Sequence, residues 1–289
     1  MKTVKLTKGT VVYKIVFFIV FLIFLAYAIS FIFPIFWLVV SSLSSKKEYQ
    51  AALSFFPSVI QWGNYAKALS AISFHGHSFF EMSFNSLWYS LGGAFLGIAT
   101  STCFSYVISK YRFFGRKILY ALAIFVMLVP IVGSFASQYR LYKVLGLLNS
   151  PTILIAFTSG FGMNFLVMTA SFDNLSWNYA EAAFIDGAGH FSVFLMIMLP
   201  QIFAPFSALF IVSFIENWND YMSPFLFMRE LPTLSTGLYL YEQEIANDFS
   251  LSMPIYFAGV VLCVIPALVL FLVFQNTIMD MTVSGGVKE

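Results

Sequence analysis

The polar residues with the most informative spacing lie in one acidic, alanine-rich segment, residues 181–189, which reads Glu-Ala-Ala-Phe-Ile-Asp-Gly-Ala-Gly. Strong helix formers across 177–185, preceded by Ser176 as a helix N-cap, predict a short surface helix. Gly187 and Gly189 follow it and predict a sharp reversal or a close backbone approach. The pattern therefore predicts a helix followed directly by a tight turn.

The chemistry that suits this segment is docking. Its alanines offer a low-profile face that a groove in a partner can enclose, and Glu181 and Asp186 supply anchoring charges. An amphipathic connector without any partner is the alternative. The residue types alone leave both interpretations open.

A second set of polar residues lies inside or beside apolar stretches. The acidic and amide members of one cluster are Glu216, Asn217, Asn219 and Asp220. They are expected either to line a polar cavity or to form a polar cap at the end of an apolar stretch, and the cap is the simpler interpretation. Asn85 and Asn164 lie within apolar stretches and are candidates for hydrogen bonds to ligand hydroxyls or to neighbouring helices.

Metal and thiol chemistry have little support. His75 and His77 are one residue apart, but only Glu81 accompanies them, so we expect a solvated loop and no metal site. Cys103 and Cys263 both lie in long apolar runs and are expected to be buried packing thiols.

Composition identifies the environment of these residues. The chain has 289 residues, of which 60% are apolar and 10% are charged, and its mean hydropathy is +0.86. Soluble domains carry about 45–50% apolar and about 25% charged residues. The apolar excess must be covered by a lipid bilayer, which excludes a soluble enzyme, a nucleic-acid binder and a disordered chain. The sequence therefore predicts an all-α integral membrane protein.

A membrane-crossing helix needs about 20 mostly apolar residues. Six stretches meet this need and form one predicted transmembrane domain over 1–289: 15–40, 82–108, 118–138, 151–172, 191–215 and 252–275. The third is short and contains Pro130, and Gly160 and Gly162 predict a kink or close packing in the fourth.

Basic residues predict the orientation of these spans. Nine of the fifteen lie before the first span, between the second and third, or at the C-terminal end. The positive-inside rule then places both termini in the cytoplasm. Residues 41–81 become an external loop with ordered structure, and residues 173–190 become a cytoplasmic loop.

The spacing Glu-Ala-Ala, three residues, Gly, nine residues, Ile-x-Leu-Pro resembles the signature of permease subunits of ABC importers. All seven fixed positions are present here: Glu181, Ala182, Ala183, Gly187, Ile197, Leu199 and Pro200. Residues 186–188 (Asp-Gly-Ala), 217–221 (Asn-Trp-Asn-Asp-Tyr) and 285–288 (Gly-Gly-Val-Lys) resemble the carbohydrate-uptake branch, in particular its maltose-type second permease. Leu175-Ser176 departs from the Ile-Pro that often precedes the helix in that family.

The resemblance implies a type I importer permease fold in the plasma membrane of a prokaryote. It also implies a second homologous permease, two nucleotide-binding ATPase subunits and an external sugar-binding protein as partners. ATP and Mg would be bound by the ATPase, and this chain would bind no cofactor and catalyse no reaction. The coupling residues implied by the motif are Glu181, Ala182, Ala183, Asp186, Gly187 and Pro200. The tail residues Gly285, Gly286 and Lys288 would reach the ATPase interface.

Three other functions remain to be compared with a sugar permease. An ABC permease for another solute would carry the same docking motif. A secondary transporter would show internal repeats and ionisable residues inside its spans. An intramembrane enzyme would need a nucleophile–base pair or a metal motif there. The predicted span interiors contain no ionisable pair for ion coupling, no nucleophile–base pair and no metal motif, and the sequence shows no internal repeat.

Overall fold

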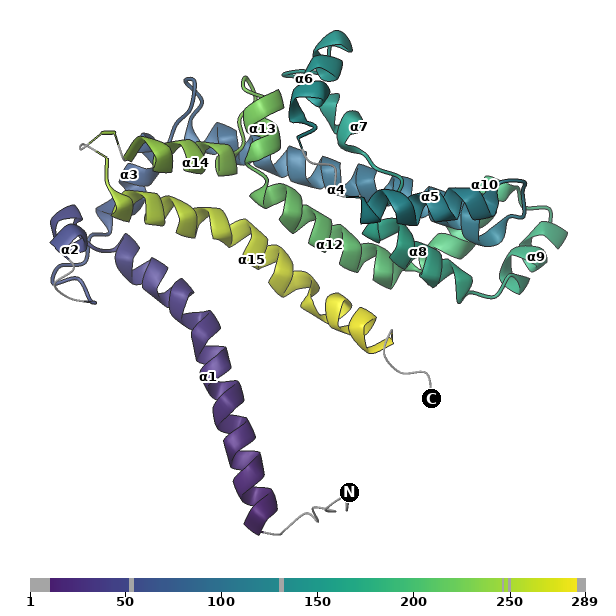
Figure 1. The fold of residues 1–289 in the computed structure, drawn as a ribbon, viewed down its shortest axis with the longest axis horizontal. Helices are drawn as coiled ribbons and strands as arrows, with labels where there is room; N and C mark the ends of the chain where they lie inside the picture. The colour runs from purple at the N-terminus through teal and green to yellow at the C-terminus, as the bar shows by residue number, and fades with distance from the viewer. Residues whose placement is uncertain (1–10, 52–54, 130–132, 246, 249–250, 285–289) are drawn as a thin grey trace. The chain divides into compact units, whose positions relative to one another are not determined.

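The computed structural model describes residues 11–51, 55–129, 133–245, 247–248 and 251–284. Every regular element in these ranges is helical, which confirms the predicted all-α class (Figure 1). The helices are α1 (Val11–Ser42), α2 (Lys46–Ala51), α3 (Gly63–Ala71), α4 (Phe79–Lys110), α5 (Arg116–Leu128), α6 (Phe135–Val144), α7 (Ile153–Phe157), α8 (Met163–Asp173), α9 (Asn178–Ile185), α10 (His190–Val193), the π-helical η1 (Phe194–Met198), α11 (Leu199–Gln201), α12 (Phe203–Asn219), α13 (Met222–Phe227), α14 (Leu234–Ile245) and α15 (Met253–Ser284).

The chain divides into two compact units, one of residues 1–68 with 244–262 and one of residues 69–243 with 263–289. In the first unit, specific hydrogen bonds order the segment that follows α1. The Asn64 side-chain amide donates to the carbonyls of Ser42 at 2.8 Å and Ser44 at 2.9 Å. Trp37 packs edge-on against Phe257, with ring centroids 5.3 Å apart. The predicted order of this loop is thus confirmed for its described part.

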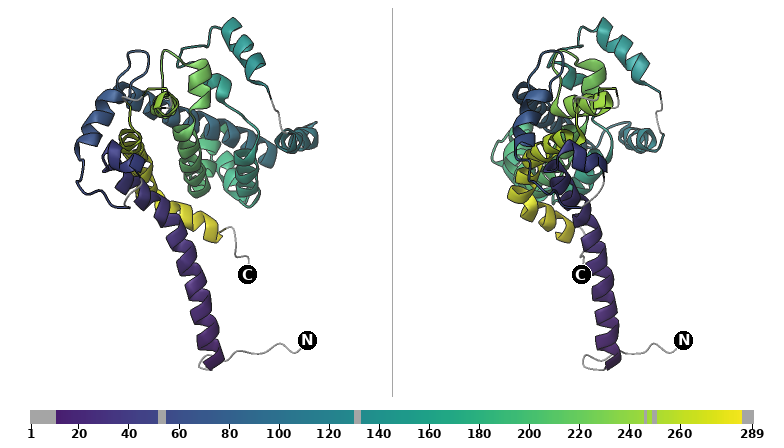
Figure 2. Two further views of the ribbon diagram at one scale, coloured as in Figure 1. Left: turned by 60° about the vertical axis from the view of Figure 1, so that its left-hand side comes forward. Right: turned by 90° about the vertical axis from the view of Figure 1, so that its left-hand side faces the viewer.

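In the second unit, α4, α8 and α12 pack against one another and form the frame of the site (Figure 1; Figure 2 gives two further views). Small and hydroxyl-bearing residues on α4 allow this close packing. The Ser105 hydroxyl donates to the Phe165 carbonyl of α8 at 2.9 Å, and the Trp218 indole of α12 donates to the Cys263 carbonyl of α15 at 3.0 Å. Each bond satisfies a buried polar group within the apolar frame.

Three described helices are long and apolar enough to cross a membrane by themselves, within α1, α4 and α15. They match the first, second and sixth predicted spans. A fourth candidate is the bent pair His190–Gln201 and Phe203–Asn219, whose axes differ by 80°. The count of six spans and the orientation of the termini therefore stay predictions.

The other predicted spans are broken helices. The stretch 118–138 contains most of α5 and the beginning of α6, and the stretch 151–172 contains α7 and most of α8. The second break includes Gly160, where an added Cβ would lie 2.6 Å from the Phe104 ring. The kink and the close packing predicted for this stretch are both present.

The bend in the fifth predicted span has a local cause. Pro200 in α11 and Pro205 in the first turn of α12 lack backbone N–H groups, and η1 already interrupts the α-helical bonding pattern before them. Ile202 between these segments has φ −108° and ψ 19°, outside helical geometry. The sequence predicted one continuous helix here, and the structure corrects that.

Candidate functional site

The acidic, alanine-rich segment forms α9 and the turn after it, as predicted. The Ser176 hydroxyl accepts the Asn178 N–H at 3.3 Å, although Trp177 occupies the N-cap position itself. After the helix, the Gly187 N–H donates to the Phe184 carbonyl at 3.1 Å and the Ala188 N–H donates to the Ala183 carbonyl at 2.9 Å. These two bonds form a Schellman motif, which needs a left-handed residue at the position of Gly187.

Gly187 supplies that conformation with φ of +84°. Gly189 does not share this role, because its φ of −76° and ψ of 158° are open to any residue. The expectation that both glycines produce the reversal is therefore wrong for Gly189. A substitution at Gly187 strains the turn, whereas the same substitution at Gly189 does not.

The two faces of α9 have different environments. Ala180 and Ala183 are buried in a cluster with Tyr106, Phe172 and Val193. Small side chains let the short helix lie close to the ends of α4 and α8. Ala183 therefore packs inside the chain, and the low-profile alanine presented outward is Ala182.

The outward face carries side chains that this unit leaves uncovered. Ile185 is 86% exposed and Tyr179 is 55% exposed. Glu181, Ala182 and Asp186 are exposed beside them. A short helix with two large apolar side chains and two carboxylates facing outward is typical of a surface that docks a partner.

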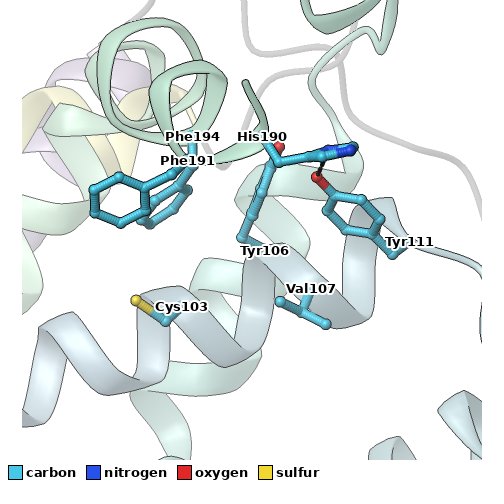
Figure 3. A pocket seen from close by; sticks show the side chains of 7 residues that line it. All are labelled: Cys103, Tyr106, Val107, Tyr111, His190, Phe191 and Phe194. Carbon is cyan, nitrogen blue, oxygen red and sulfur yellow. Dashed lines mark hydrogen bonds between the residues drawn. The ribbon is translucent and has the colours of Figure 1, made fainter. Parts of the chain in front are cut away.

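The loop that contains α9 is attached to the end of α4 at both of its sides. On the entry side, the Lys110 ammonium donates to the Leu175 carbonyl at 2.7 Å, and the Ser109 hydroxyl donates to the Asp173 carboxylate. On the exit side, the Tyr111 hydroxyl lies 2.8 Å from Nδ1 of His190 (Figure 3). Consecutive residues at one helix end thus hold both ends of the loop.

Aromatic rings fill the space between these attachments. Trp177 packs edge-on against Tyr111 with ring centroids 5.9 Å apart, and Phe184 packs against His190 at 4.8 Å. In the sequence, Lys110 is one of the basic residues that predict the orientation of the spans, and nothing there assigns Tyr111 or His190 to the site. Only the arrangement of Tyr and Lys at the end of an apolar stretch could have suggested them.

An apolar cavity of about 570 Å³ lies beside this attachment, lined by α4 and the α10–η1 segment. Figure 3 shows the side chains of Cys103, Val107, Phe191 and Phe194 around it. Cys103 is exposed here, whereas Cys263 is buried. The expectation of a buried thiol was therefore wrong for Cys103, which lines this open cavity.

The two amide residues predicted inside spans bind the protein itself. Asn85 donates to the Pro232 carbonyl at 3.0 Å and accepts from the Trp88 indole at 3.1 Å. Asn164 on α8 donates to the Ser213 hydroxyl on α12 at 3.2 Å. Asn164 thus bonds to a neighbouring helix, whereas Asn85 joins α4 to the loop before α14.

The cluster at the end of α12 has members in different roles. The Asp220 carboxylate accepts from the buried Tyr89 hydroxyl at 2.8 Å and from the Ser223 N–H at 3.0 Å. Asn217 packs against α4, where a Cβ on Gly93 would lie 2.8 Å from the amide nitrogen. Asn219 donates to the Ile215 carbonyl of its own helix at 2.8 Å. Glu216 is exposed.

The remaining motif positions lie at the bend and at the C-terminal end. Pro200 is exposed in α11, directly before the bend. The tail residues Gly285, Gly286 and Lys288 lie outside the described residues.

Comparison with known proteins gives a family match over more than half of the chain. Residues 93–280 match the family model described as "Binding-protein-dependent transport system inner membrane component". The arabinooligosaccharides transport system permease protein AraQ of Bacillus subtilis (strain 168) is 29% identical over 274 residues, covering 92% of this chain and 94% of AraQ. The maltodextrin transport system permease protein MdxG of the same organism is 30% identical over 208 residues, covering 71% of this chain and 74% of MdxG.

A solved structure gives the same fold. It is a chain from a bacterial ABC transporter involved in the import of the acidic polysaccharide alginate, with a TM-score of 0.72 and 21% sequence identity. The match covers 95% of this chain and 99% of the other. The chain therefore belongs to the family of binding-protein-dependent transport system inner membrane components.

Proposed function

We propose that this chain is a permease subunit of an ATP-driven, binding-protein-dependent importer in the plasma membrane of a prokaryote. It pairs with a second, homologous permease, and each permease docks on one of two ATPase subunits that bind ATP and Mg. An external binding protein delivers the solute. The chain supplies part of the pathway and the mechanical connection, whereas the chemistry of ATP hydrolysis belongs to the partner.

The observation that carries this proposal is the outward face of α9. Ile185, Ala182 and Glu181 lie exposed on a helix whose opposite face is buried. In our proposal this outward face enters a cleft of the ATPase, with Glu181 as the principal docking charge and Asp186 beside it. Gly187 fixes the direction in which the chain leaves the contact.

A lever must move with the element to which it transmits force. The attachment of the α9 loop to Lys110 and Tyr111 makes α4 the first recipient of any displacement of α9. Because α4 packs on α8 and α12, the movement spreads through the helical frame. Alternating access then follows from rigid displacement of packed helices.

The proposed solute is a sugar or an oligosaccharide. Support comes from the names of relatives, which are permeases for arabinooligosaccharides, for maltodextrin and for melibiose, raffinose and stachyose. The proposed pathway-lining residues remain Asn85, Asn164, Glu216, Asn217, Asn219 and Asp220. Glu216 is the strongest of these, because the other five contact this chain's own helices and loops.

Site-directed cross-linking tests the docking surface. In a Cys103→Ser background, the Ala182→Cys, Ala183→Cys and Ile185→Cys variants are purified with their ATPase and treated with a thiol-to-amine cross-linker. We expect products containing the nucleotide-binding subunit, identified by mass spectrometry, from positions 182 and 185. Ala183 is the matched control because its side chain is buried. Cross-linking from position 183 alone would contradict the proposal.

A separate measurement tests the solute. ATP hydrolysis by the complex in proteoliposomes is compared with binding protein loaded with different saccharides, peptides or phosphate. We expect stimulation by a saccharide. Stimulation by a non-sugar solute alone would keep the permease role and overturn the substrate class.

A further inference from the structure

The loop between α4 and α5 carries a surface that the proposed transport role does not use. This surface contains three cations, Arg112 in the loop and Arg116 and Lys117 at the beginning of α5, with Phe113 and Phe114 between the first and second. The Phe114 side chain is fully exposed, and Phe113 is 39% exposed. Large exposed rings among cations are unusual on a water-facing turn and common where a chain meets a membrane surface.

Two of the three cations have no partner among the described residues. Arg116 donates to the Ser109 carbonyl at 3.2 Å. Arg112 and Lys117 are exposed and form no hydrogen bond or ion pair with any residue that the structure describes. Lys110, the nearest other cation, is already engaged with the Leu175 carbonyl.

The cations and the rings surround one cavity of about 520 Å³, whose lining includes Arg112, Phe114 and Lys117. No carboxylate is among its lining residues. Asp173 accepts a hydrogen bond from Ser109 and lines a neighbouring cavity, whose wall also includes Arg116 and Lys117. The cavity with Arg112 thus has a net positive wall and an apolar rim.

The neighbouring helices place this cavity at the edge of the hydrocarbon. α4 is one of the helices long and apolar enough to span a membrane, and it ends at Lys110. α5 begins directly after the loop and exposes Ile118 and Phe125, at 62% and 61%. An acyl chain can follow the exposed apolar side of α5 while its headgroup lies at the loop.

We propose that the cavity formed by Arg112, Phe114, Arg116 and Lys117 binds the phosphodiester headgroup of an anionic phospholipid. Arginine and lysine neutralise the phosphate, and the exposed rings lie among the first acyl carbons. A zwitterionic lipid brings its own positive charge to the same wall and binds less well. This site is independent of the docking role of α9.

Native mass spectrometry of the full-length chain tests the proposal. The detergent-purified protein is incubated with phosphatidylglycerol or with phosphatidylcholine of the same acyl chains, and the retained lipid is counted. We expect preferential retention of phosphatidylglycerol. Arg112→Gln/Lys117→Gln should lower that retention about thirtyfold, and Phe114→Ser should lower it less. Arg112→Lys/Lys117→Arg should retain it.

The matched control removes another exposed basic pair from the same unit, Arg140→Gln/Lys143→Gln. We expect wild-type retention from this variant. Equal loss from both double variants would show general charge attraction and overturn the site. Equal retention of the two lipids by wild type, or displacement of phosphatidylglycerol by millimolar inorganic phosphate, would also overturn it.

Discussion

The Tyr111 hydroxyl lies 2.8 Å from Nδ1 of His190 and joins the C-cap of α4 to the first residue of α10. The preceding residue, Lys110, holds the Leu175 carbonyl on the other side of α9. Two residues that are adjacent in sequence, Lys110 and Tyr111, therefore hold the segments before and after α9 by hydrogen bonds. A short helix of eight residues is marginal alone and depends on such contacts for its position.

Removal of the Tyr111 hydroxyl should weaken the attachment of the α9 loop to α4 and leave the aromatic packing in place. A neutral hydrogen bond contributes about 0.5–1.5 kcal/mol, so we expect Tyr111→Phe to lower solute transported per ATP by roughly twofold to tenfold. The measurement is parallel uptake and ATP hydrolysis in proteoliposomes. Tyr120→Phe is the control, because the exposed Tyr120 hydroxyl makes no hydrogen bond within the described residues. An unchanged ratio in Tyr111→Phe would contradict the anchoring role.

The bond between Tyr89 and Asp220 should stabilise the junction of α4 with the end of α12. Tyr89 is buried, and its hydroxyl donates to a carboxylate at 2.8 Å. Hydrogen bonds to charged groups contribute about 1.5–3 kcal/mol, so Tyr89→Phe should lower the free energy of unfolding by about that amount. Thermal unfolding in detergent measures the loss. Tyr221→Phe should leave the transition in place, since that residue is exposed and stacks on Tyr239.

The segment after α1 should respond to acid through Glu48. The pKa of this carboxyl is held below its usual value by hydrogen bonds. The Ser58 hydroxyl contributes most, and the Ser45 hydroxyl, at 2.9 Å, contributes next. A depressed folded-state pKa gives stability that is present above the unfolded pKa, about 4.3, and is lost as pH falls through the folded value. The exchange protection factors of residues 45–51 and 55–58, which correct for the intrinsic pH dependence of amide exchange, should therefore fall below about pH 4.3, and Glu48→Gln should remove this step. A step of equal size in Glu48→Gln would show that other groups produce it.

The local features of the site could be predicted from sequence. Gly187 after a run of helix formers specified the Schellman turn, because all its bonds lie within a few residues. Ala182 and Ala183 could not be assigned to opposite faces without knowing what α9 packs against. The hydrogen bond between Tyr111 and His190 could not be predicted either, because the two residues are far apart in sequence and meet only when α4 and α10 are in place.

The fold shows a similar division. Continuous apolar runs predicted α1, α4 and α15 well, because an uninterrupted apolar stretch that is long enough to cross a membrane forms a single long helix. The breaks near Gly160 and Ile202 depend on tertiary contacts and on prolines, and hydropathy averages over them. Apolar content therefore located the spans better than it described their shapes.

Paired glycine variants test whether α9 and its turn couple ATP hydrolysis to transport. Gly187→Val places a β-branched residue at φ of +84°, which costs about 1–3 kcal/mol, whereas Gly189→Val enters ordinary extended backbone. Both are compared with wild type for membrane level, ATP hydrolysis and uptake in the assembled complex. Gly187→Asn tests rescue, because asparagine tolerates the left-handed conformation. We expect normal insertion and continued ATP hydrolysis in Gly187→Val, with at least about tenfold less uptake per ATP than in wild type. We expect near-normal coupling in Gly189→Val and partial recovery in Gly187→Asn. Wild-type uptake per ATP in Gly187→Val would contradict the coupling role.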